Sequence, residues 1–402
     1  MNEDSPEAIP PSSVNYTLQD LVFYMLRLGT IGFGGPVALV GYMHRDLVEQ
    51  RRWLTEKDYK EGLTLAQIMP GPLAAQLAIY LGFAHYSVLG ATLAGVAFVL
   101  PSFLMVLVIG WAYVSYGGLN WMQAVFYGVG AAVIAIIAHS AYKLTTKSIG
   151  KDFLLWGIYL VSAITTIVTE SEMIALFLGA GLITWLVRCP PKWFQRSGST
   201  AASFFPLGAI ASPVMTDSSQ TLTQIALFFT KAGAFVFGSG LAIVPFLYSG
   251  VVREYGWLNE DQFLDAVAVA MITPGPVVIT VGFIGYIVAG IWGAVVAAIA
   301  TFLPCYLLTI IPAPYFRRHG KRPGLVAFVD GVTAAAIGAI AGAVIILGRR
   351  TIFESGHTPD MAKLAIFLVS LVLLWKVKKL SEPILVLAAA LVGLAVFPIV
   401  KG

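Results

Sequence analysis

The sequence predicts an all-α polytopic membrane protein of two homologous repeats, inverted relative to each other, each with about five spans and one re-entrant pair of half-helices. Three observations support this fold class. Of the 402 residues, 58% are hydrophobic and 11% are charged, whereas soluble proteins carry about 25% charged residues. Two long stretches, 62–142 and 266–316, contain no Lys, Arg, Asp or Glu, so each has room for several spans of about 20 residues. The third observation is an internal duplication.

The duplication is found when the sequence is compared with itself at an offset of 204 residues. Phe33-Gly34 then matches Phe237-Gly238, and Pro70-Gly71-Pro72 matches Pro274-Gly275-Pro276. After a gap of one residue the match continues through Pro101 and Pro304. The duplication divides the chain into an external N-terminal tail (1–19), a first repeat (20–188), a linker rich in Pro, Ser and Thr (189–220) and a second repeat (221–402).

Each repeat contains six apolar segments, and the second segment carries the Pro-Gly-Pro motif. We expect them at 20–43, 62–83, 86–114, 121–141, 152–168 and 172–188 in the first repeat, and at 222–249, 266–288, 289–312, 325–347, 361–375 and 383–400 in the second. The first 20 residues have no basic region, so a cleaved signal peptide is not expected.

Positive charges orient these segments in the membrane. If the Pro-Gly-Pro segment is re-entrant, the basic residues in 45–60, 143–151 and 188–196 all lie in the cytoplasm, as the positive-inside rule requires. Five spans per repeat is an odd number, so the second repeat is inserted upside down, and its basic residues in 317–322 and 376–379 are also cytoplasmic. This arrangement places 18 basic residues inside and 5 outside, with both termini external. Arg349, Arg350 and Lys363 lie on the side that the rule disfavours.

Two further basic residues, Arg27 and Lys231, lie within the first apolar segment of their repeats and are equivalent under the 204-residue offset. A cation inside a span costs about 2.5 to 3.5 kcal/mol and normally faces a cavity or a partner. The alternative is that the long side chain extends to the headgroups. Because the cation recurs in both repeats, we expect Arg27 and Lys231 to bind the substrate together.

A break rich in glycine follows each of these cations. Gly34 and Gly35 precede a proline in the first repeat, and Gly238 and Ser239 are their equivalents in the second. A helix break inside the bilayer is tolerated only where the freed backbone faces protein or water. Close packing of two helices is the alternative explanation. We count these four residues as candidate substrate-binding residues.

The Pro-Gly-Pro motif interrupts an uncharged segment in both repeats. We expect a helix to stop before the first proline and to restart with the second proline at its first position. The restarted half-helix exposes N–H groups and the positive end of its dipole, which favours an anion. A simple kink is the alternative. The candidate substrate-binding residues here are Gly71, Pro72, Gly275 and Pro276, flanked by the side chains of Gln67 and Thr273.

Three carboxylates are candidates for coupling transport to an ion gradient. Glu61 and Asp265 are equivalent and lie at the edge of the Pro-Gly-Pro segments, where a solvated interfacial position is the alternative, and Asp330 lies within a span. The histidines show no ligand spacing, so we assign no metal. The sequence has no Walker A pattern, catalytic nucleophile or cofactor motif, which disfavours an enzyme or an ATP-driven pump.

The order of these motifs, a Phe-Gly-Gly-Pro break, then Trp-Leu-x-Glu, then Pro-Gly-Pro, resembles the chromate ion transporter family in its long form with two fused halves. The likeness covers nearly the whole chain apart from the first twenty or so residues and the linker, and the second copy departs from it at Ser239 and Gly240. The resemblance implies a secondary transporter that exports chromate across the bacterial inner membrane and confers chromate resistance.

The same resemblance implies that sulfate, another tetrahedral dianion, competes with chromate or is a second substrate. We expect a small oxyanion and the lipid bilayer as partners, with no cofactor and no nucleic acid, and a homodimer is left open. A carrier for sulfate or another oxyanion, and a passive anion channel, are alternatives that the sequence does not separate from a chromate exporter.

Overall fold

The computed structural model is helical throughout the residues it describes, which are 16–33, 35–116, 120–170, 174–190, 218–235, 240, 243–319, 323–353, 359–377 and 380–401; no strand occurs among them. The first repeat contains α1 (Leu18–Ile31), α2 (Gly35–Met43), the π-helix η2 (His44–Gln50), α3 (Glu56–Ile68), α4 (Leu73–Tyr116), α5 (Asn120–Ser148), α6 (Phe153–Thr169) and α7 (Ile174–Arg188). The second repeat contains α8 (Ser218–Phe235), α9 (Ile243–Leu247), the π-helix η4 (Tyr248–Glu254), α10 (Glu260–Ile272), the 3-10 helix η5 (Val277–Ile279), α11 (Thr280–Ile310), α12 (Ala313–His319), α13 (Pro323–Ile352), α14 (Met361–Lys376) and α15 (Glu382–Lys401). Among the described residues, five helices are long and apolar enough to cross a membrane.

The segment 20–43, which we expected to be one interrupted span, is instead two short helices that fold back on each other. α1 ends where Gly32 leaves the helical conformation, and α2 begins at Gly35 with a positive φ of 73°. The hydroxyl of Tyr24 in α1 then donates to Asp46 in η2 at 3.2 Å. This contact requires η2 to lie beside the middle of α1, so the expectation of a single crossing is corrected here.

The chain also reverses at the first Pro-Gly-Pro motif, so the expected helix break is present. α3 ends at Ile68 and α4 begins at Leu73, and Gly71 between them has a φ of +143°. Beyond the break, Tyr80 lies against Gly62, where an added Cβ would come within 2.3 Å of the Tyr80 ring. Since Gly62 and Tyr80 lie on opposite sides of the motif, the two half-helices run antiparallel.

A second tight reversal divides α4 where the sequence predicted a boundary between two segments. Ser87 has a φ of 55°, and Gly82 before it contacts the carbonyl oxygen of Gly90 after it. The second repeat repeats this turn at Gly290, whose φ is 61°. Both long helices therefore consist of a short half-helix followed by an antiparallel long helix.

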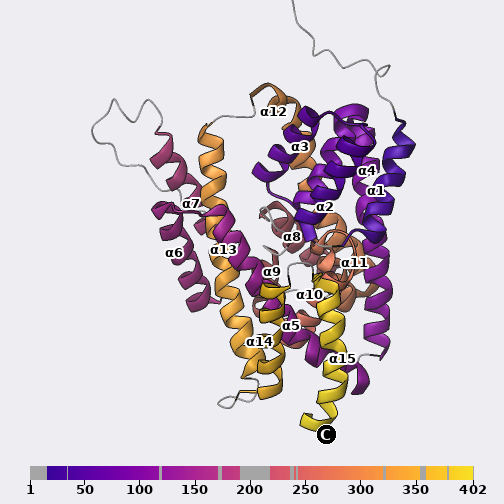
Figure 1. The fold of residues 1–402 in the computed structure, drawn as a ribbon, viewed down its shortest axis with the longest axis vertical. Coiled ribbons are helices and arrows are strands. Elements are labelled where there is room, and N and C mark those ends of the chain that lie inside the picture. Colours follow the sequence, from indigo (N-terminus) through magenta and orange to yellow (C-terminus); the bar gives the residue numbers. More distant parts are fainter. Residues whose placement is uncertain are drawn as a thin grey trace, which may run out of the picture.

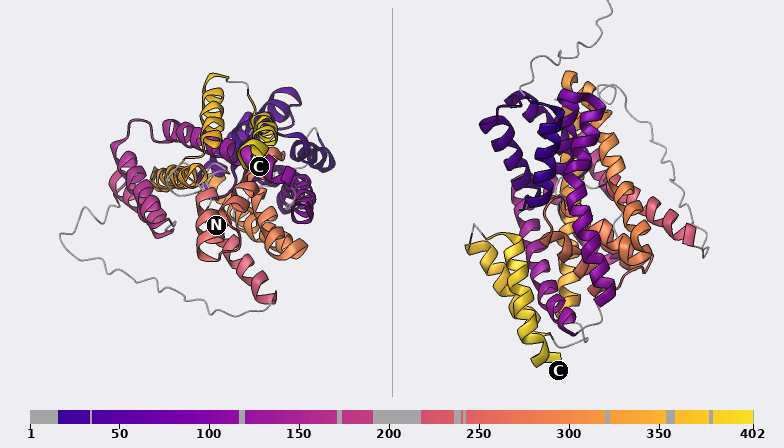
Figure 2. Two further views of the ribbon diagram at one scale, coloured as in Figure 1. Left: turned by 90° about the horizontal axis from the view of Figure 1, so that it is seen from below. Right: turned by 90° about the vertical axis from the view of Figure 1, so that its right-hand side faces the viewer.

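The two repeats have the same order of helices, and helices of each repeat pack against helices of the other. α1 lies on α4 in the first repeat and α8 lies on α11 in the second, and α4 also packs on α11. α5 of the first repeat packs against α14 and α15 of the second, while α13 of the second packs against α6 and α7 of the first (Figures 1 and 2). The repeats defined by the sequence are therefore not separate folding units, because each completes the other's helical layer.

Two equivalent helix pairs cross at equivalent glycines. Gly29 on α1 lies against the carbonyl oxygen of Phe98, and its equivalent Gly233 on α8 lies against that of Thr301. An added Cβ would come within 2.2 Å and 2.1 Å of those oxygens, respectively. Small residues at such crossings let two backbones approach closely, which is how helices associate without a hydrophobic driving force in lipid.

Ion pairs join the repeats near both ends of α13. Arg188 at the end of α7 pairs with Asp152 and with Asp330 near the start of α13. At its other end, Arg350 pairs with Glu170 of the first repeat and with Glu260 at the start of α10. Arg350 lies on the side of the membrane that the positive-inside rule disfavours. Carboxylates of both repeats thus neutralise its charge.

The N-terminal end of the described chain lies beside the loop that follows η2. The Tyr16 ring stacks on Trp53 with 4.9 Å between ring centroids, and Tyr86 donates to the Tyr16 carbonyl oxygen at 2.5 Å. We had expected an external tail over residues 1–19 and a cytoplasmic loop at Trp53. The stacking holds residue 16 at the same end of the molecule as Trp53; residues 1–15 of the expected tail lie outside the described chain.

Candidate oxyanion site

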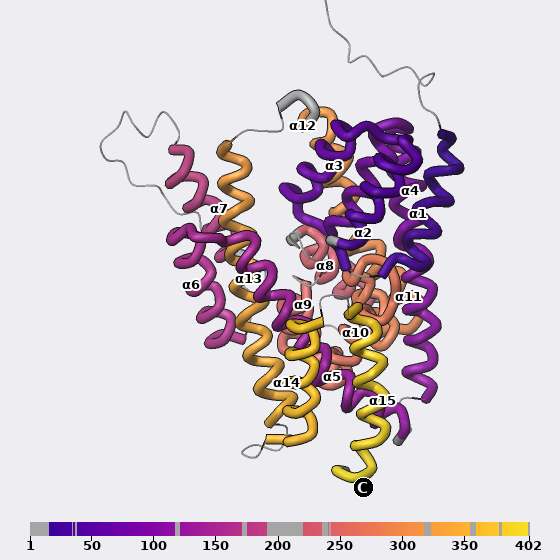
Figure 3. Tube along the Cα trace, viewed as in Figure 1, coloured from indigo at the N-terminus to yellow at the C-terminus, as the bar shows by residue number. Residues whose placement is uncertain are grey.

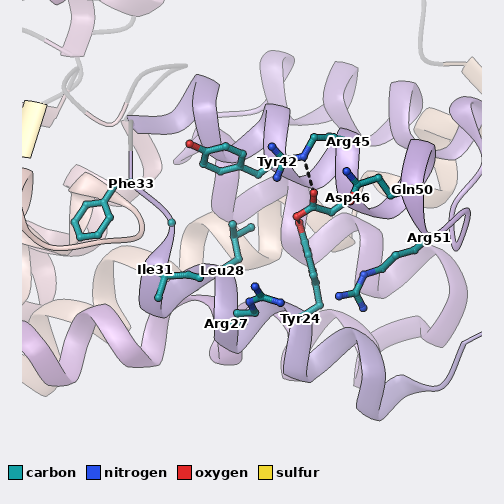
Figure 4. Close-up of a pocket in the computed structure, with 11 residues that line it drawn as sticks. Tyr24, Arg27, Leu28, Ile31, Phe33, Tyr42, Arg45, Asp46, Gln50 and Arg51 are labelled. Carbon is teal, nitrogen blue, oxygen red and sulfur yellow. Dashed lines mark hydrogen bonds and ion pairs between the residues drawn. The ribbon is translucent and has the colours of Figure 1, made fainter. Parts of the chain in front are cut away.

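A basic cavity of about 480 Å³ lies where α2 and η2 fold back along α1 (Figures 3 and 4). The capping box of Thr17 and Asp20 fixes the start of α1, and three turns later Arg27 projects from it toward η2. Tyr24 and Arg51 flank the cavity beside Arg27, and Arg45 and Asp46 approach from η2. The cavity therefore exists because the glycine break turns the chain back.

Three arginines and one aspartate give the cavity a formal charge of +2. The Arg45 guanidinium donates to Asp46 at 2.8 Å, and this hydrogen bond holds the pKa of Arg45 above its ordinary value. Arg51 lies over the rings of Tyr24 and Trp53, at 5.4 Å and 4.5 Å from their centroids. Arg27 has no ion pair with any described residue. A tetrahedral dianion would balance the charge of this site, and guanidinium groups match oxyanions with paired hydrogen bonds.

The floor of this cavity rests on the second repeat. Gly32, which lines the cavity, accepts a hydrogen bond from the backbone N–H of Gly275 at 2.9 Å. The Ser102 hydroxyl donates to the carbonyl oxygen of Pro274 at 2.6 Å and so holds the same motif in place. Gly275 has a φ of +96°, and an added Cβ there would come within 2.0 Å of the Ser102 hydroxyl oxygen. The Pro-Gly-Pro motif of one repeat thus supports the glycine break of the other.

The residues of the first Pro-Gly-Pro motif form a closed packing rather than an open site. The Gln76 side chain donates to the Pro70 carbonyl oxygen at 2.8 Å, and the sulfur of Cys305 lies 3.0 Å from the position of a Cβ on Gly71. Pro72 is buried as well, and so are Gly275 and Pro276 in the second motif. Neither motif is among the residues that line the basic cavity.

Two flanking side chains also lie outside the cavity, contrary to our expectation. Gln67 is exposed on α3, and Thr273 donates its hydroxyl to the carbonyl oxygens of Val269 and Ala270. A threonine near a helix end commonly bonds back to the preceding turn in this way. Gly34, Gly238 and Ser239 lie outside the described residues, while Gly35 is placed at the start of α2 beside the cavity-lining loop.

Lys231 does not join Arg27 in a shared site. It is exposed on α8 and is not among the residues that line the basic cavity. The corner of the second repeat that corresponds to the basic cavity is filled with rings: Phe228 stacks on Phe246 at 5.3 Å, and Tyr255 packs edge-on against Phe228 at 5.6 Å. The expectation that the two equivalent cations meet is not supported by this geometry, because aromatic rings pack together at described equivalents of the cavity-lining residues.

The family model described as Chromate transporter matches residues 19–185 and 223–394, which coincide with the two repeats. This chain belongs to the chromate transporter family. A chromate transport protein of Cupriavidus metallidurans is 66% identical over 96% of this chain and 94% of its own length. A probable chromate transport protein of Synechococcus elongatus is 63% identical over 94% and 95%, and a chromate transport protein of Pseudomonas aeruginosa is 31% identical over 98% and 95%. No solved structure matches this member of the family.

Sequence reasoning missed most of the side chains that line the basic cavity of this family member. Arg45 and Arg51 were interpreted as topology signals, and Tyr24, Tyr42 and Asp46 were not singled out. At the 204-residue offset, Arg45 becomes Ser249 and Arg51 becomes Tyr255. Inverted repeats explain this exchange by the positive-inside rule alone, so it gave no separate signal of a binding cavity.

The three candidate coupling carboxylates occupy different environments. Glu61 is half-buried and accepts a long hydrogen bond from Tyr80 at 3.4 Å. Asp330 shares Arg188 with Asp152 and so belongs to a structural ion pair near the start of α13. Asp265 is buried and accepts a hydrogen bond from Tyr113 at 2.7 Å. Equivalent sequence positions thus differ in burial, and Asp265 is the most enclosed of the three.

Proposed function

We propose that this chain is a secondary transporter that exports chromate from the bacterial cytoplasm across the inner membrane and so confers chromate resistance. The observation that carries the proposal is the cavity of Arg27, Arg45 and Arg51 with Asp46, whose net charge of +2 matches a tetrahedral dianion. Membership of the chromate transporter family supports chromate as that dianion. Sulfate has the same shape and charge and is the natural competitor.

We propose that Arg27 contributes most to binding. Arg45 is already hydrogen bonded to Asp46, and Arg51 is held over two aromatic rings, whereas Arg27 has no ion pair among the described residues. An arginine within an apolar helix is costly unless a partner compensates it. A bound oxyanion would supply that compensation. Contact with Arg27 would therefore contribute the most free energy to substrate binding.

Movement of the two repeats would carry the substrate across. The cavity floor is bonded to the second repeat through Gly32 and Gly275, so a shift between repeats would change the cavity itself. Alternating access in transporters built from repeats commonly takes this form. α5 and α13 each pack against helices of the other repeat, and these contacts would keep the repeats attached during such a shift.

The experiment measures chromate flux in inverted membrane vesicles, with and without a proton gradient. A transporter accumulates chromate against its electrochemical gradient, and sulfate competes for uptake. Flux that only dissipates the chromate gradient would identify a passive anion channel. Uptake that sulfate drives and chromate does not inhibit would instead identify a sulfate carrier.

We also propose that the repeats are inverted, with their Pro-Gly-Pro hairpins entering the bilayer from opposite faces. Supporting this, α3 packs near the start of α13 and against α12, while Glu260 at the start of α10 pairs with Arg350 at the end of α13. In Figure 1, α1 to α3 lie in the upper half of the molecule, whereas α9 and α10 lie below them, near its middle. Labelling of single cysteines in 44–60 and 313–324 tests this topology. Both loops should react from the cytoplasm, and labelling from opposite faces would refute inversion.

The folded-back α1 and α2 change the expected number of crossings in this topology. A pair that enters and leaves on one face contributes no span, so the described N-terminal end at Tyr16 would be cytoplasmic together with Trp53. The inner membrane and a possible dimer remain part of the same proposal. A cysteine at position 17 should therefore be labelled from the same side as one at position 52.

A further inference from the structure

A second polar cavity, of about 420 Å³, lies at the end of the molecule where α10 begins. Helices of both repeats line it, and two oppositely charged side chains, Asp265 of α10 and Lys363 of α14, are buried there with 6% and 5% of their surfaces exposed. Asn259 and Asp261 at the start of α10 are exposed and mark its opening. This cavity shares no lining residue with the basic cavity.

The hydrogen bond of Asp265 comes from a tyrosine. The Tyr113 hydroxyl, on α4, donates to one carboxylate oxygen at 2.7 Å. A carboxylate in so enclosed a place usually accepts several hydrogen bonds or a direct ion pair, and desolvation disfavours its charged form. A tyrosine hydroxyl can donate to a carboxylate and accept from a carboxylic acid. This contact is therefore compatible with either protonation state.

Lys363 supplies the positive charge of the cavity. Its ammonium group lies 4.9 Å from the centroid of the Tyr127 ring, a cation–π distance, and the Tyr127 hydroxyl donates to Asp360 at 2.6 Å. Asp360 also caps the start of α14, on which Lys363 lies. The lysine is thus fixed in place by the helix that carries it and by an aromatic ring of the other repeat.

The ionisable groups that line this cavity with Asp265 come from four helices. They are Tyr113 from α4, Tyr127 from α5, Asp261 from α10 itself and Lys363 from α14; the remaining lining residues, Gln123, Phe126, Gly130, Asn259, Gln262, Leu264, Thr351 and Phe397, do not titrate. A sodium ion would need about five or six oxygen ligands around one point, and the ammonium of Lys363 in the same cavity opposes a bound metal cation. A proton needs only the free carboxylate oxygen.

We propose that Asp265 is a proton-binding residue, reached through the mouth at Asn259 and Asp261 and balanced by Lys363, that couples proton uptake to chromate transport. The proton binds to a carboxylate oxygen of Asp265 and neutralises it while Tyr113 keeps its hydrogen bond. The role in coupling rests on the proposed transport function; proton binding does not. Because the mouth lies at the end opposite α3, the proton would enter from the face opposite the basic cavity.

Proton binding is tested without chromate, by infrared difference spectroscopy of the full-length protein in lipid as the pH is changed. A protonated carboxyl band should be present in the wild type, absent in Asp265→Asn and retained in Asp261→Asn, the exposed carboxylate one helical turn away. Tyr113→Phe removes one hydrogen bond and should shift the pH at which the band appears. An unchanged band in Asp265→Asn, or an unchanged midpoint in Tyr113→Phe, would overturn the proposal.

Coupling is tested in proteoliposomes with the membrane potential clamped to zero. A one-unit pH gradient should support about tenfold accumulation of chromate per coupled proton. Asp265→Asn should keep exchange of external for internal chromate within about twofold of wild type but lose this accumulation, whereas Asp261→Asn and Asp265→Glu should keep both.

Two outcomes would overturn coupling at this residue: wild-type accumulation in Asp265→Asn, or accumulation that requires sodium on either side. If Asp265→Asn loses exchange as well, Tyr113→Phe decides, because altered accumulation at constant exchange supports the role and unaltered accumulation refutes it. Absence of chromate exchange in the wild type would instead refute the transport function, and the infrared measurement would still determine whether Asp265 binds a proton.

Discussion

Equivalent corners of the two repeats have the same backbone plan and opposite contents. In the first repeat, α1 and η2 enclose a cavity lined by Tyr24, Arg45 and Arg51. In the second, the equivalent residues are Phe228, Ser249 and Tyr255, and the rings pack on one another. The comparison teaches that one backbone plan can enclose a charged, hollow interior in one repeat and pack aromatic rings in the described part of the equivalent corner in the other.

One exchange in particular explains how the second corner was filled. Asp46 of the first repeat corresponds to Gly250, and an added Cβ on Gly250 would come within 2.0 Å of the Phe228 ring. The ring therefore occupies the space that a side chain at this position would need. The second corner lacks both the carboxylate and the arginine that it binds, since Arg45 corresponds to Ser249, so it has no charged pair to keep solvated.

The contrast between the two corners is tested most directly by replacing each of the two equivalent cations with alanine. Arg27→Ala should lower chromate transport by about 10- to 100-fold, because Arg27 lines the cavity and a hydrogen bond to a charged group contributes about 1.5–3 kcal/mol. Lys231→Ala should change it by less than about threefold, since Lys231 does not line the basic cavity. Flux into vesicles is measured at matched amounts of inserted protein.

Arg27→Lys serves as the charge control and should retain part of the activity, because it keeps the cation and loses the planar donor group. Wild-type flux in Arg27→Ala would mean that this arginine only reaches the headgroups. Equal losses in Arg27→Ala and Lys231→Ala would mean that both corners serve the substrate, and the contrast between them would then be wrong.

A second test separates the two glycines that shape the site. Gly275→Ala should destabilise the protein by about 1–3 kcal/mol or more, because the new Cβ overlaps Ser102 and the φ of +96° is strained for alanine. Gly35→Ala should cost about 1 kcal/mol, since its φ is +73° but no atom lies within 4 Å of the new Cβ. Thermal unfolding in detergent gives the order, and a larger loss in Gly35→Ala would contradict the proposed contact between repeats.

Helix breaks were predictable from the sequence because glycine and proline act locally. The interruptions at Gly32–Gly35, Pro70–Pro72 and Pro274–Pro276 follow from residues whose backbone preferences need no tertiary information. The direction of the chain after a break was not predictable. Whether α2 continues α1 or folds back depends on contacts such as Tyr24 with Asp46, which join residues 22 positions apart.

The site was only partly predictable for a related reason. Arg27 was found because a cation in an apolar helix is unusual on its own. Arg45 and Arg51 lie in a polar segment where basic residues are expected, so only the fold distinguishes them as cavity residues. The assumption that equivalent positions share a role also failed for Lys231, since sequence symmetry does not reveal which corner has filled with aromatic rings.

The carboxylate of the basic cavity offers a finer test of the comparison. Asp46 accepts a hydrogen bond from Arg45. Asp46→Asn should release that guanidinium for the substrate and lower the KM for chromate by about two- to tenfold, an effect on the order of 1 kcal/mol. Glu49→Gln is the matched control, because Glu49 is exposed on the same π-helix and pairs with His44 outside the cavity. An equal effect in both variants would indicate general surface charge and not competition within the site.

The smallest expected effect concerns two equivalent helix caps. Asp152 caps α6 and pairs with Arg188, and hydrogen bonding to that guanidinium holds the pKa of Asp152 below its ordinary value. Asp360 caps α14 in the second repeat and accepts a hydrogen bond from Tyr127.

Because the folded-state pKa of Asp152 lies below the unfolded value of about 3.9, its stabilisation is present above that pH and is lost as the pH falls through the folded-state value. The Asp152 side chain is about one-third exposed, so solvent screening limits the effect to about 1 kcal/mol, or a few degrees of melting temperature. Asn keeps the cap but not the ion pair, so Asp152→Asn should flatten the fall in melting temperature between neutral and acid pH more than Asp360→Asn does. Melting curves of both variants from pH 7 to pH 3 measure the difference, and equal slopes would show that the arginine contributes nothing beyond the cap.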